Sequence, residues 1–271
     1  MNFEESSVFI GFGNMGSAIV NSISKKNIFN DMLVIESDKS KTANNSSKKI
    51  RFSNSISEEL SDHKYVWLCI KPQSFGYLAK EIKPYLRSNQ IIISIMAGIT
   101  INQINDRTNH EKIIRIMPNT PAQISKGISV WNSTNNLSEM EKNKIENALN
   151  SFGKSIYLDD ESMINLSTAL SGSGPGFLYR ILESFIFAGE KIGLSKEVSK
   201  KLAIETFIGS AELINITENS PKNLREAVTS PGGTTEAGLN LLEKKEIDKL
   251  IYEMMKEAVK RGNDLAQESD K

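Results

Sequence analysis

The sequence has few of the side chains that most often carry out chemistry. Among 271 residues it contains one cysteine, Cys69, and two histidines, His63 and His110. One cysteine cannot form an intrachain disulfide, and these three residues do not make a set with metal-ligand spacing. We therefore expect no metal site and a reducing, cytoplasmic location, and we expect a bound cofactor to supply any chemistry.

The sequence also lacks an excess of charge and a long apolar run. Its 33 lysines and arginines balance 33 aspartates and glutamates, which removes the electrostatic reason to bind nucleic acid or an anionic membrane. The N-terminal segment is acidic where a signal peptide is basic, and no stretch reaches the ~20 apolar residues of a membrane helix. We expect neither a nucleic-acid partner nor a membrane partner.

The first part of the chain alternates short β-branched runs with amphipathic segments, which is typical of βα units around a parallel sheet. The segment Asp38–Ser57 is rich in Ser, Lys and Asn, and we expect a weak helix and a turn there, with a linker as the alternative. The expected strands are Ser7–Ile10, Met32–Glu36, Tyr65–Ile70, Ile91–Ile95 and Ile113–Met117.

From about Asp159 the spacing of apolar residues becomes helical. Gly193 is typical of a helix C-cap and Ser195 of the next N-cap. Because the chain exceeds the about 100–150 residues of a typical domain, we expect an α/β domain over residues 1–160 and an all-α domain over residues 161–271. Several of the expected helices are apolar over wide faces, which fits either a subunit interface or packing of the helices on each other.

A glycine-rich segment follows the first expected strand and opens an amphipathic stretch. It reads Gly11-Phe12-Gly13-Asn14-Met15-Gly16. In such a segment the first glycine permits a tight turn, the second lets the backbone approach a pyrophosphate, and the third lets helix and strand pack closely. The pyrophosphate lies at the helix N-terminus, where backbone amides lack partners. The strand before and the helix after favour a dinucleotide-binding, Rossmann-type doubly wound sheet over a structural glycine turn.

The second expected strand ends at Glu36, followed by Ser37. An acidic residue at this place accepts hydrogen bonds from the adenosine ribose hydroxyls and favours NAD, whereas a basic residue favours NADP. Lys39 and Lys41 are near enough along the chain to reach a phosphate, so the pattern leaves NADPH and NADH open. Solvated loop charges are the alternative for all of them.

Three further loops follow expected strands, and ligands of open α/β sheets bind at the carboxyl ends of strands. We expect these loops to border the cofactor crevice, with Lys71 as a positioning residue, or alternatively a catalytic acid, and Asn119 in a turn that its flanking prolines make rigid. An ordinary turn is the alternative at Asn119. The loops are Cys69-Ile70-Lys71-Pro72, Met96-Ala97-Gly98 and Pro118-Asn119-Thr120-Pro121.

Two glycine-rich segments interrupt the helical second part. Glycines within Ser171–Gly176 indicate a close approach of another backbone or of a ligand. In Thr229–Thr235, the amides around Gly233 and Thr234 at a helix N-terminus suit a carboxylate. The alternative is that Thr234 is only an N-cap and that Ser230 belongs to an ordinary turn.

Together these segments resemble the pyrroline-5-carboxylate reductase family from end to end. The resemblance runs through FIGFGNMGSAI, CIKPQ, RIMPNTP, LSGSGPGFLY and, most specifically, LREAVTSPGGTTEAGL. It implies a Rossmann domain, a helical domain for dimerisation and substrate binding, NADPH or NADH as cofactor, and reduction of 1-pyrroline-5-carboxylate to L-proline. It also implies self-association as a dimer, with a ring of dimers as a further assembly.

The resemblance also implies roles for residues of the second part. Thr235 matches the threonine that contacts the ring nitrogen of the substrate, Glu218 matches an acidic residue near that nitrogen, and Glu161 matches a further acidic position. The residues that match the site of the substrate carboxylate are Ser230, Gly233 and Thr234.

In the first part, Asn54 resembles a cofactor-contacting asparagine. Two positions depart from the family. Gly176-Phe177 replaces the usual Ala-Tyr, which removes a hydroxyl, and Glu36 stands where Asn or a small residue is common, which bears on the usual preference for NADP.

Reduction of a protonated C=N by a borrowed hydride needs no strong base, which agrees with the shortage of histidines. A β-hydroxyacid dehydrogenase has the same two-domain plan but needs a general base, which in that family is a lysine after the interdomain glycines. Gly172–Tyr179 contains no lysine, and Arg180 does not lose its proton. A non-catalytic dinucleotide sensor, the third hypothesis, would not need the complete SPGGTT loop.

Overall fold

The computed structural model describes residues 3–42 and 49–268, with side chains up to residue 264. The chain forms two compact units, of which one comprises residues 1–173 with 258–271 and the other residues 174–257. We call them the sheet unit and the helical unit. The expected boundary between domains at residues 160 and 161 stays a prediction.

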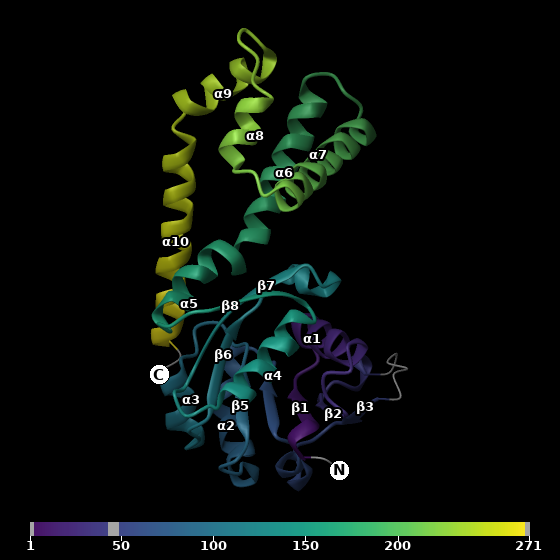
Figure 1. The fold of residues 1–271 in the computed structure, drawn as a ribbon, viewed down its shortest axis with the longest axis vertical. Helices are drawn as coiled ribbons and strands as arrows, with labels where there is room; N and C mark the ends of the chain where they lie inside the picture. Colours follow the sequence, from purple (N-terminus) through teal and green to yellow (C-terminus); the bar gives the residue numbers. More distant parts are fainter. Residues whose placement is uncertain (1–2, 43–48, 269–271) are drawn as a thin grey trace. The chain divides into compact units, whose positions relative to one another are not determined.

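The sheet unit contains eight strands in one sheet (Figure 1). Their bounds are β1 Ser6–Ile10, β2 Asp31–Ile35, β3 Ile50–Ser53, β4 Tyr65–Leu68, β5 Ile91–Ser94, β6 Ile113–Met117, β7 Gly127–Ser133 and β8 Gly153–Tyr157. The strand order is β3-β2-β1-β4-β5-β6-β7-β8, and only the β6–β7 pair is antiparallel. The order reverses between β1 and β4, and open α/β sheets bind ligands at the carboxyl ends of the strands at such a point.

Helices cover both faces of this sheet. One apolar cluster contains residues of α1 (Asn14–Lys25) and α4 (Glu139–Asn150), and the other contains residues of α2 (Phe75–Ile82) and α3 (Ile101–Thr108). Successive apolar residues of β1, β2, β4 and β5 alternate between the two clusters, as expected of a sheet buried on both sides. The short helix α5 (Ser162–Ser167) follows β8. The predicted Rossmann-type sheet followed by a helical part is confirmed.

All five expected strands are confirmed, and three strands were missed. The strand β3 lies inside Asp38–Ser57, where a helix and a turn were expected, and the described part of that segment has only a single 3₁₀ turn at Lys39–Lys41. The expectation, and the linker alternative, were wrong for Ile50–Ser53, because pairing with β2 supplies hydrogen bonds that local composition does not reveal. Residues 43–48 lie outside the described residues. The missed strands β7 and β8 pair with each other, and α4 lies between them in the sequence.

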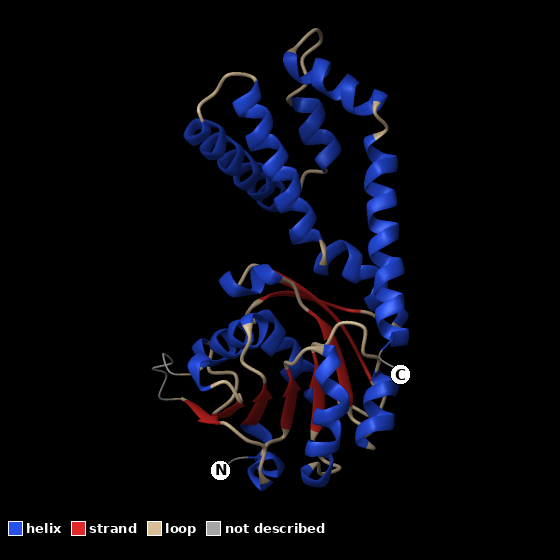
Figure 2. Cartoon of the chain, turned by 180° about the vertical axis from the view of Figure 1, so that it is seen from behind, coloured by secondary structure: helices blue, strands red, loops and turns tan. Residues whose placement is uncertain are grey.

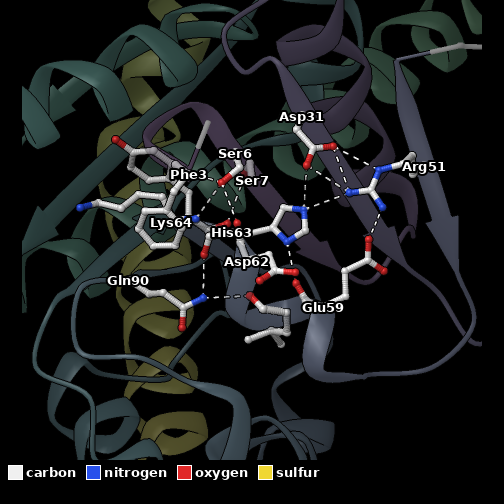
Figure 3. Close-up of polar contacts among 12 residues, drawn as sticks. Phe3, Ser6, Ser7, Asp31, Arg51, Glu59, Asp62, His63, Lys64 and Gln90 are labelled. Carbon is white, nitrogen blue, oxygen red and sulfur yellow. Dashed lines mark hydrogen bonds and ion pairs between the residues drawn. The ribbon is translucent and has the colours of Figure 1, made fainter. Parts of the chain in front are cut away.

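A network of polar side chains lies where β1, β2, β4 and β5 begin (Figure 3). His63 is buried, and its Nε2 lies 3.4 Å from Asp31 Oδ2. Arg51 Nη2 donates to Asp31 Oδ1 at 3.0 Å. Gln90 Nε2 donates to the carbonyl oxygens of His63 and Leu60. These bonds join the amino ends of the strands, so His63 lies at the opposite edge of the sheet from the strands' carboxyl ends.

The helical unit consists of helices and connecting loops (Figure 2). Gly193 has φ +109°, and Ser195 Oγ accepts from Val198 N at 3.3 Å, which confirms the predicted helix end and N-cap. Within this unit, Ala203 is the one hydrophobic side chain that is buried. None of the helices in the described residues combines the length and apolar character needed to cross a bilayer. The helices are α6 Gly174–Lys191, α7 Lys196–Thr217, α8 Pro221–Ala227, α9 Thr234–Lys244 and the first part of α10 Ile247–Glu268.

Candidate cofactor and substrate sites

The glycine-rich loop connects β1 to α1, and each of its glycines has a different constraint. Gly11 has φ +100°, and a Cβ there would lie 2.6 Å from the carbonyl oxygen of Cys69. A Cβ at Gly16 would lie 2.5 Å from the carbonyl oxygen of Gly11, whereas a Cβ at Gly13 would meet nothing within 4 Å. The loop therefore turns tightly at Gly11, packs closely at Gly16 and leaves open space at Gly13, which fits the approach of a pyrophosphate.

A cavity of about 400 Å³ lies beside this loop at the carboxyl ends of β1, β2, β3 and β4. The predicted cofactor residue Asn54, which follows β3, lines it together with residues after the other three strands. The predicted residues that line the cavity are Gly11, Gly13, Glu36, Ser37, Asn54, Cys69, Ile70 and Lys71. The structure thus brings into one cavity residues that the sequence separates by up to 60 positions.

The other predicted cofactor residues do not line this cavity. Phe12 is buried, and its ring centroid lies 5.4 Å from that of Phe52. The side chain of Asn119 donates from Nδ2 to the Ser171 carbonyl oxygen and accepts at Oδ1 from the backbone amide of Ile128. Asn119 therefore uses its side-chain amide to join segments of the sheet unit. The remaining residues of this group lie in the first turn of α1, in the loop after β4 and in the loop after β5: Asn14, Met15, Gly16, Pro72, Met96, Ala97 and Gly98.

The Glu36 carboxylate is tied to the glycine-rich loop. Its Oε2 accepts from Phe12 N at 2.8 Å, its Oε1 accepts from Asp38 N at 3.0 Å, and Lys41 Nζ lies 3.4 Å from Oε2. Burial alone would raise the pKa of Glu36, but the two backbone amides and the Lys41 ammonium outweigh it and hold the pKa below its ordinary value. The cavity therefore contains a fixed carboxylate that is ionised at neutral pH.

Cys69 is a packing residue of the cavity rather than a reactive one. Burial raises the pKa of its thiol to about 12, so the thiol stays protonated. Its amide donates to the Ile10 carbonyl at 2.8 Å, and its Cβ would lie 3.1 Å from a Cβ at Gly16. The exposed Lys71 follows at the cavity edge, before a 3₁₀ turn that begins at Pro72.

In the helical unit, the SPGGTT loop folds onto the N-terminus of α9. Gly233 is the N-cap and donates from its amide to the Ser230 carbonyl at 2.9 Å, so the alternative that Thr234 is the N-cap is wrong. Gly232 has φ +73°, and its amide donates to Glu236 Oε2 at 2.8 Å. The tight turn leaves the side chains of Ser230, Thr234 and Thr235 exposed beside the helix N-terminus. This arrangement can bind a carboxylate.

The two predicted acidic residues lie in different surroundings. Glu218 is exposed and ends α7 in the left-handed conformation, with φ +55°. Glu161 belongs to the sheet unit, where its Oε1 accepts from Arg115 Nη1 at 2.9 Å and from Ile101 N at 2.8 Å. Because Arg115 is only 2% exposed, the Glu161 carboxylate balances a buried charge. The substrate-binding role of Glu161 stays a prediction.

The predicted approach of another backbone is not found at the glycines of Ser171–Gly176, of which only Gly172 has a close neighbour, a side chain. A Cβ at Gly172 would lie 2.8 Å from Met117 Cε, so Gly172 permits the chain to pack against the end of β6. A Cβ at Gly174 or Gly176 would meet nothing within 4 Å. The sequence predicted all three glycines alike because composition does not show which of them has a neighbour.

Several residues of the cavity were not predicted. Tyr77, on α2, is 77% exposed and lines the cavity with Ile56 and Glu81. The amphipathic pattern of α2 predicts which residues are buried, such as Ile82, but does not show which part of the helix borders a cavity. No signal in the sequence singles out Tyr77.

Comparisons with known proteins cover both units. Residues 161–265 match the family model described as pyrroline-5-carboxylate reductase dimerisation. Residues 7–98 match the family model described as NADP oxidoreductase, coenzyme F420-dependent. The two matched ranges contain the SPGGTT loop and the glycine-rich loop, respectively.

The chain is 35% identical over 268 residues to the pyrroline-5-carboxylate reductase of Staphylococcus haemolyticus, covering 97% of this chain and 98% of the relative. It is similar to the solved pyrroline-5-carboxylate reductase of Coxiella burnetii, with a TM-score of 0.90, 30% identity and coverage of 97% and 99%. It is also similar to the Plasmodium falciparum pyrroline carboxylate reductase solved with NADP bound, with a TM-score of 0.83, 30% identity and coverage of 97% and 99%.

Proposed function

The chain belongs to the pyrroline-5-carboxylate reductase family, and from this premise we propose how its residues perform the reaction. The protein reduces 1-pyrroline-5-carboxylate to L-proline, and NADPH or NADH supplies the hydride when bound. The observation that carries this function is the similarity to curated reductases over 97% of the chain. That similarity includes both the glycine-rich loop and the SPGGTT loop.

The glycine-rich loop and the cavity beside it hold the cofactor in this proposal. The open space at Gly13 and the N-terminus of α1 support a pyrophosphate site formed by the backbone of residues 11–16. Glu36, Ser37 and Asn54 line the cavity where the second and third strands end, which supports contacts with the adenosine part. The residues proposed to border the rest of the cofactor are Cys69, Ile70, Lys71, Pro72, Met96, Ala97, Gly98 and Asn119.

The SPGGTT loop binds the substrate in this proposal. The backbone amides of Gly233 and Thr234 and the hydroxyl of Ser230 hold the carboxylate, because the loop places them at the N-terminus of α9. Thr235, in the first turn of α9 with an exposed side chain, contacts the ring nitrogen. Glu218 supplies negative charge near the protonated imine. Glu161 is a further residue that we propose for substrate binding, and its ion pair with Arg115 is a structural role beside this one.

The protein has little covalent chemistry to perform. A protonated C=N accepts hydride without a catalytic base, so the residues need only orient the substrate and follow the change of charge at nitrogen. The Thr235 hydroxyl hydrogen-bonds the nitrogen as the iminium becomes an amine. The amides of Gly233 and Thr234 fix the carboxylate and thereby the position of the carbon that is reduced.

The helical unit forms a dimer in this proposal. The match of residues 161–265 to a dimerisation family supports self-association, and the wide apolar faces of the unit stay exposed in the single chain. These faces therefore do not pack only on each other. We infer a ring of dimers as a further assembly from the family. We infer a cytoplasmic location from the single cysteine. Exposed apolar residues of the unit include Leu178, Phe185, Phe187, Leu202, Ile208 and Leu241.

The function is tested by incubating the purified protein with 1-pyrroline-5-carboxylate and NADPH or NADH. We expect loss of nicotinamide absorbance matched mole for mole by L-proline, measured by chromatography. Absence of proline with both cofactors would refute the reductase function. Nucleotide binding without turnover would then favour the dinucleotide sensor, and oxidation of a β-hydroxyacid would favour the dehydrogenase.

A further inference from the structure

We propose that Glu36 makes this protein prefer NADH to NADPH. The inference rests on the proposed function and deepens it, because it assigns which cofactor the same cavity selects. NADPH differs from NADH only by a phosphate on the 2′-hydroxyl of the adenosine ribose. Selection between them therefore arises where that hydroxyl lies, which in sheets of this kind is the end of the second strand.

The Glu36 carboxylate is held in place from two sides. The amide of Phe12, in the glycine-rich loop, and the amide of Asp38, in the turn after β2, donate to different carboxylate oxygens. The side chain is only 8% exposed. Turning the carboxylate away to admit a phosphate would leave both amides without an acceptor. The negative charge therefore remains at this end of the cavity when a nucleotide binds.

The same carboxylate suits the ribose of NADH. An ionised carboxylate offers about four acceptor positions, and the amides of Phe12 and Asp38 occupy two of them. The 2′- and 3′-hydroxyls of an unmodified ribose are donors that can use the remaining positions. A 2′-phosphate has lost the hydroxyl donor and adds a charge of about −1.5 to −2, which meets the like charge of Glu36 in a partly buried cavity.

Lys41 is the residue that argues for the opposite preference, since a basic residue after the second strand can bind a 2′-phosphate. Its ammonium lies 3.4 Å from Glu36 Oε2 and 3.8 Å from Asp38 Oδ2. One positive charge therefore stands between two negative charges, and the three side chains together keep a net negative charge. The other described lysine that lines the cavity, Lys71, follows β4 rather than β2. The combined charge of Glu36, Asp38 and Lys41 thus opposes a 2′-phosphate.

The proposal is tested by isothermal titration calorimetry of the intact protein with NADH and with NADPH, without substrate. We expect the Kd for NADH to be at least about tenfold lower. In Glu36→Gln the ratio of the two Kd values should fall at least about tenfold, chiefly because NADPH binds more tightly. The matched control is Glu139→Gln, which makes the same substitution on an exposed side chain of α4 that does not line the cavity, and should leave the ratio within about threefold.

A second measurement keeps the test independent of how well Glu36→Gln folds. On the wild-type protein, 5′-AMP should compete with NADH more strongly than adenosine 2′,5′-bisphosphate, because these fragments differ only in the 2′-phosphate. Equal binding of NADH and NADPH, tighter binding of NADPH, or an unchanged ratio in folded Glu36→Gln would overturn the inference while leaving the reductase function intact. Failure of both nucleotides to bind would overturn the proposed function and the inference with it.

Discussion

Two glycines of the loop between β1 and α1, Gly16 and Gly13, should respond to the same substitution in different ways. A Cβ at Gly16 would lie 2.5 Å from the carbonyl oxygen of Gly11 and 3.1 Å from Cys69 Cβ. The oxygen is a backbone atom at the end of β1, so the first turn of α1 must move away from the strand. Overpacking of this kind costs about 1–3 kcal/mol, which lowers the Tm of a chain of this size by roughly 2–12 °C.

Gly13→Ala should leave stability nearly unchanged and weaken nucleotide binding. A Cβ at Gly13 meets nothing within 4 Å, and the φ of −73° is one that alanine adopts freely. Alanine restricts the unfolded chain but is a poorer N-cap than glycine, so the free energy of unfolding should change by less than about 1 kcal/mol. Gly13 lines the cavity, however, and the added methyl group takes the space proposed for the pyrophosphate. We expect the Kd for NADH and NADPH to rise at least about tenfold.

The two variants are compared with the wild type by thermal unfolding, followed by circular dichroism, and by nucleotide titration calorimetry. Each variant serves as the control for the other, because both add one methyl group to the same loop. Wild-type stability in Gly16→Ala would show that the close packing of α1 on β1 is not as described. Wild-type nucleotide affinity in Gly13→Ala would show that the pyrophosphate does not approach this backbone.

Three further substitutions test other parts of the proposal. Thr235→Ala removes a hydrogen bond worth about 1.5–3 kcal/mol in the transition state, so kcat/KM should fall about 10–150-fold at an unchanged nucleotide Kd, and undiminished turnover would contradict the assignment. Burial alone would raise the pKa of Glu141, but Lys112, a backbone amide and Lys64 hold it at about 2. Because the folded pKa lies below the ordinary 4.5, this residue contributes at most about 3 kcal/mol above that pH and loses it as the pH falls toward 2. Glu141→Gln should therefore flatten the fall of Tm in acid, and an unaltered slope would argue against this account. Phe187→Glu places a charge on the exposed apolar face of α6 and should shift dimers to monomers in light scattering, whereas an unchanged dimer would locate the interface elsewhere.

Local patterns were sufficient to predict strands β1, β2, β4, β5 and β6, the glycine-rich loop and the helical second part. Residues 8–10, 65–68 and 91–93 are buried apolar runs, and burial on both faces of a parallel sheet selects such runs directly. Gly193 and Ser195 mark a helix end and a helix start because the conformational freedom of glycine and the serine cap act within one turn. These features could be predicted because their physical cause lies within a few neighbouring residues.

Contacts between distant segments established the rest. The Glu36 carboxylate reaches Phe12 across 24 positions, and Glu161 reaches Ile101 across 60. The edge strand β3 forms because it pairs with β2, and Asn54 lines the cavity because it follows β3. The spacing of apolar residues predicts which side of a helix or strand is buried, but it does not predict which buried amide or arginine a distant carboxylate will contact. The shortage of cysteine, histidine and net charge pointed to a borrowed cofactor, and the folded sheet placed the Glu36 carboxylate at the cavity that we propose for it.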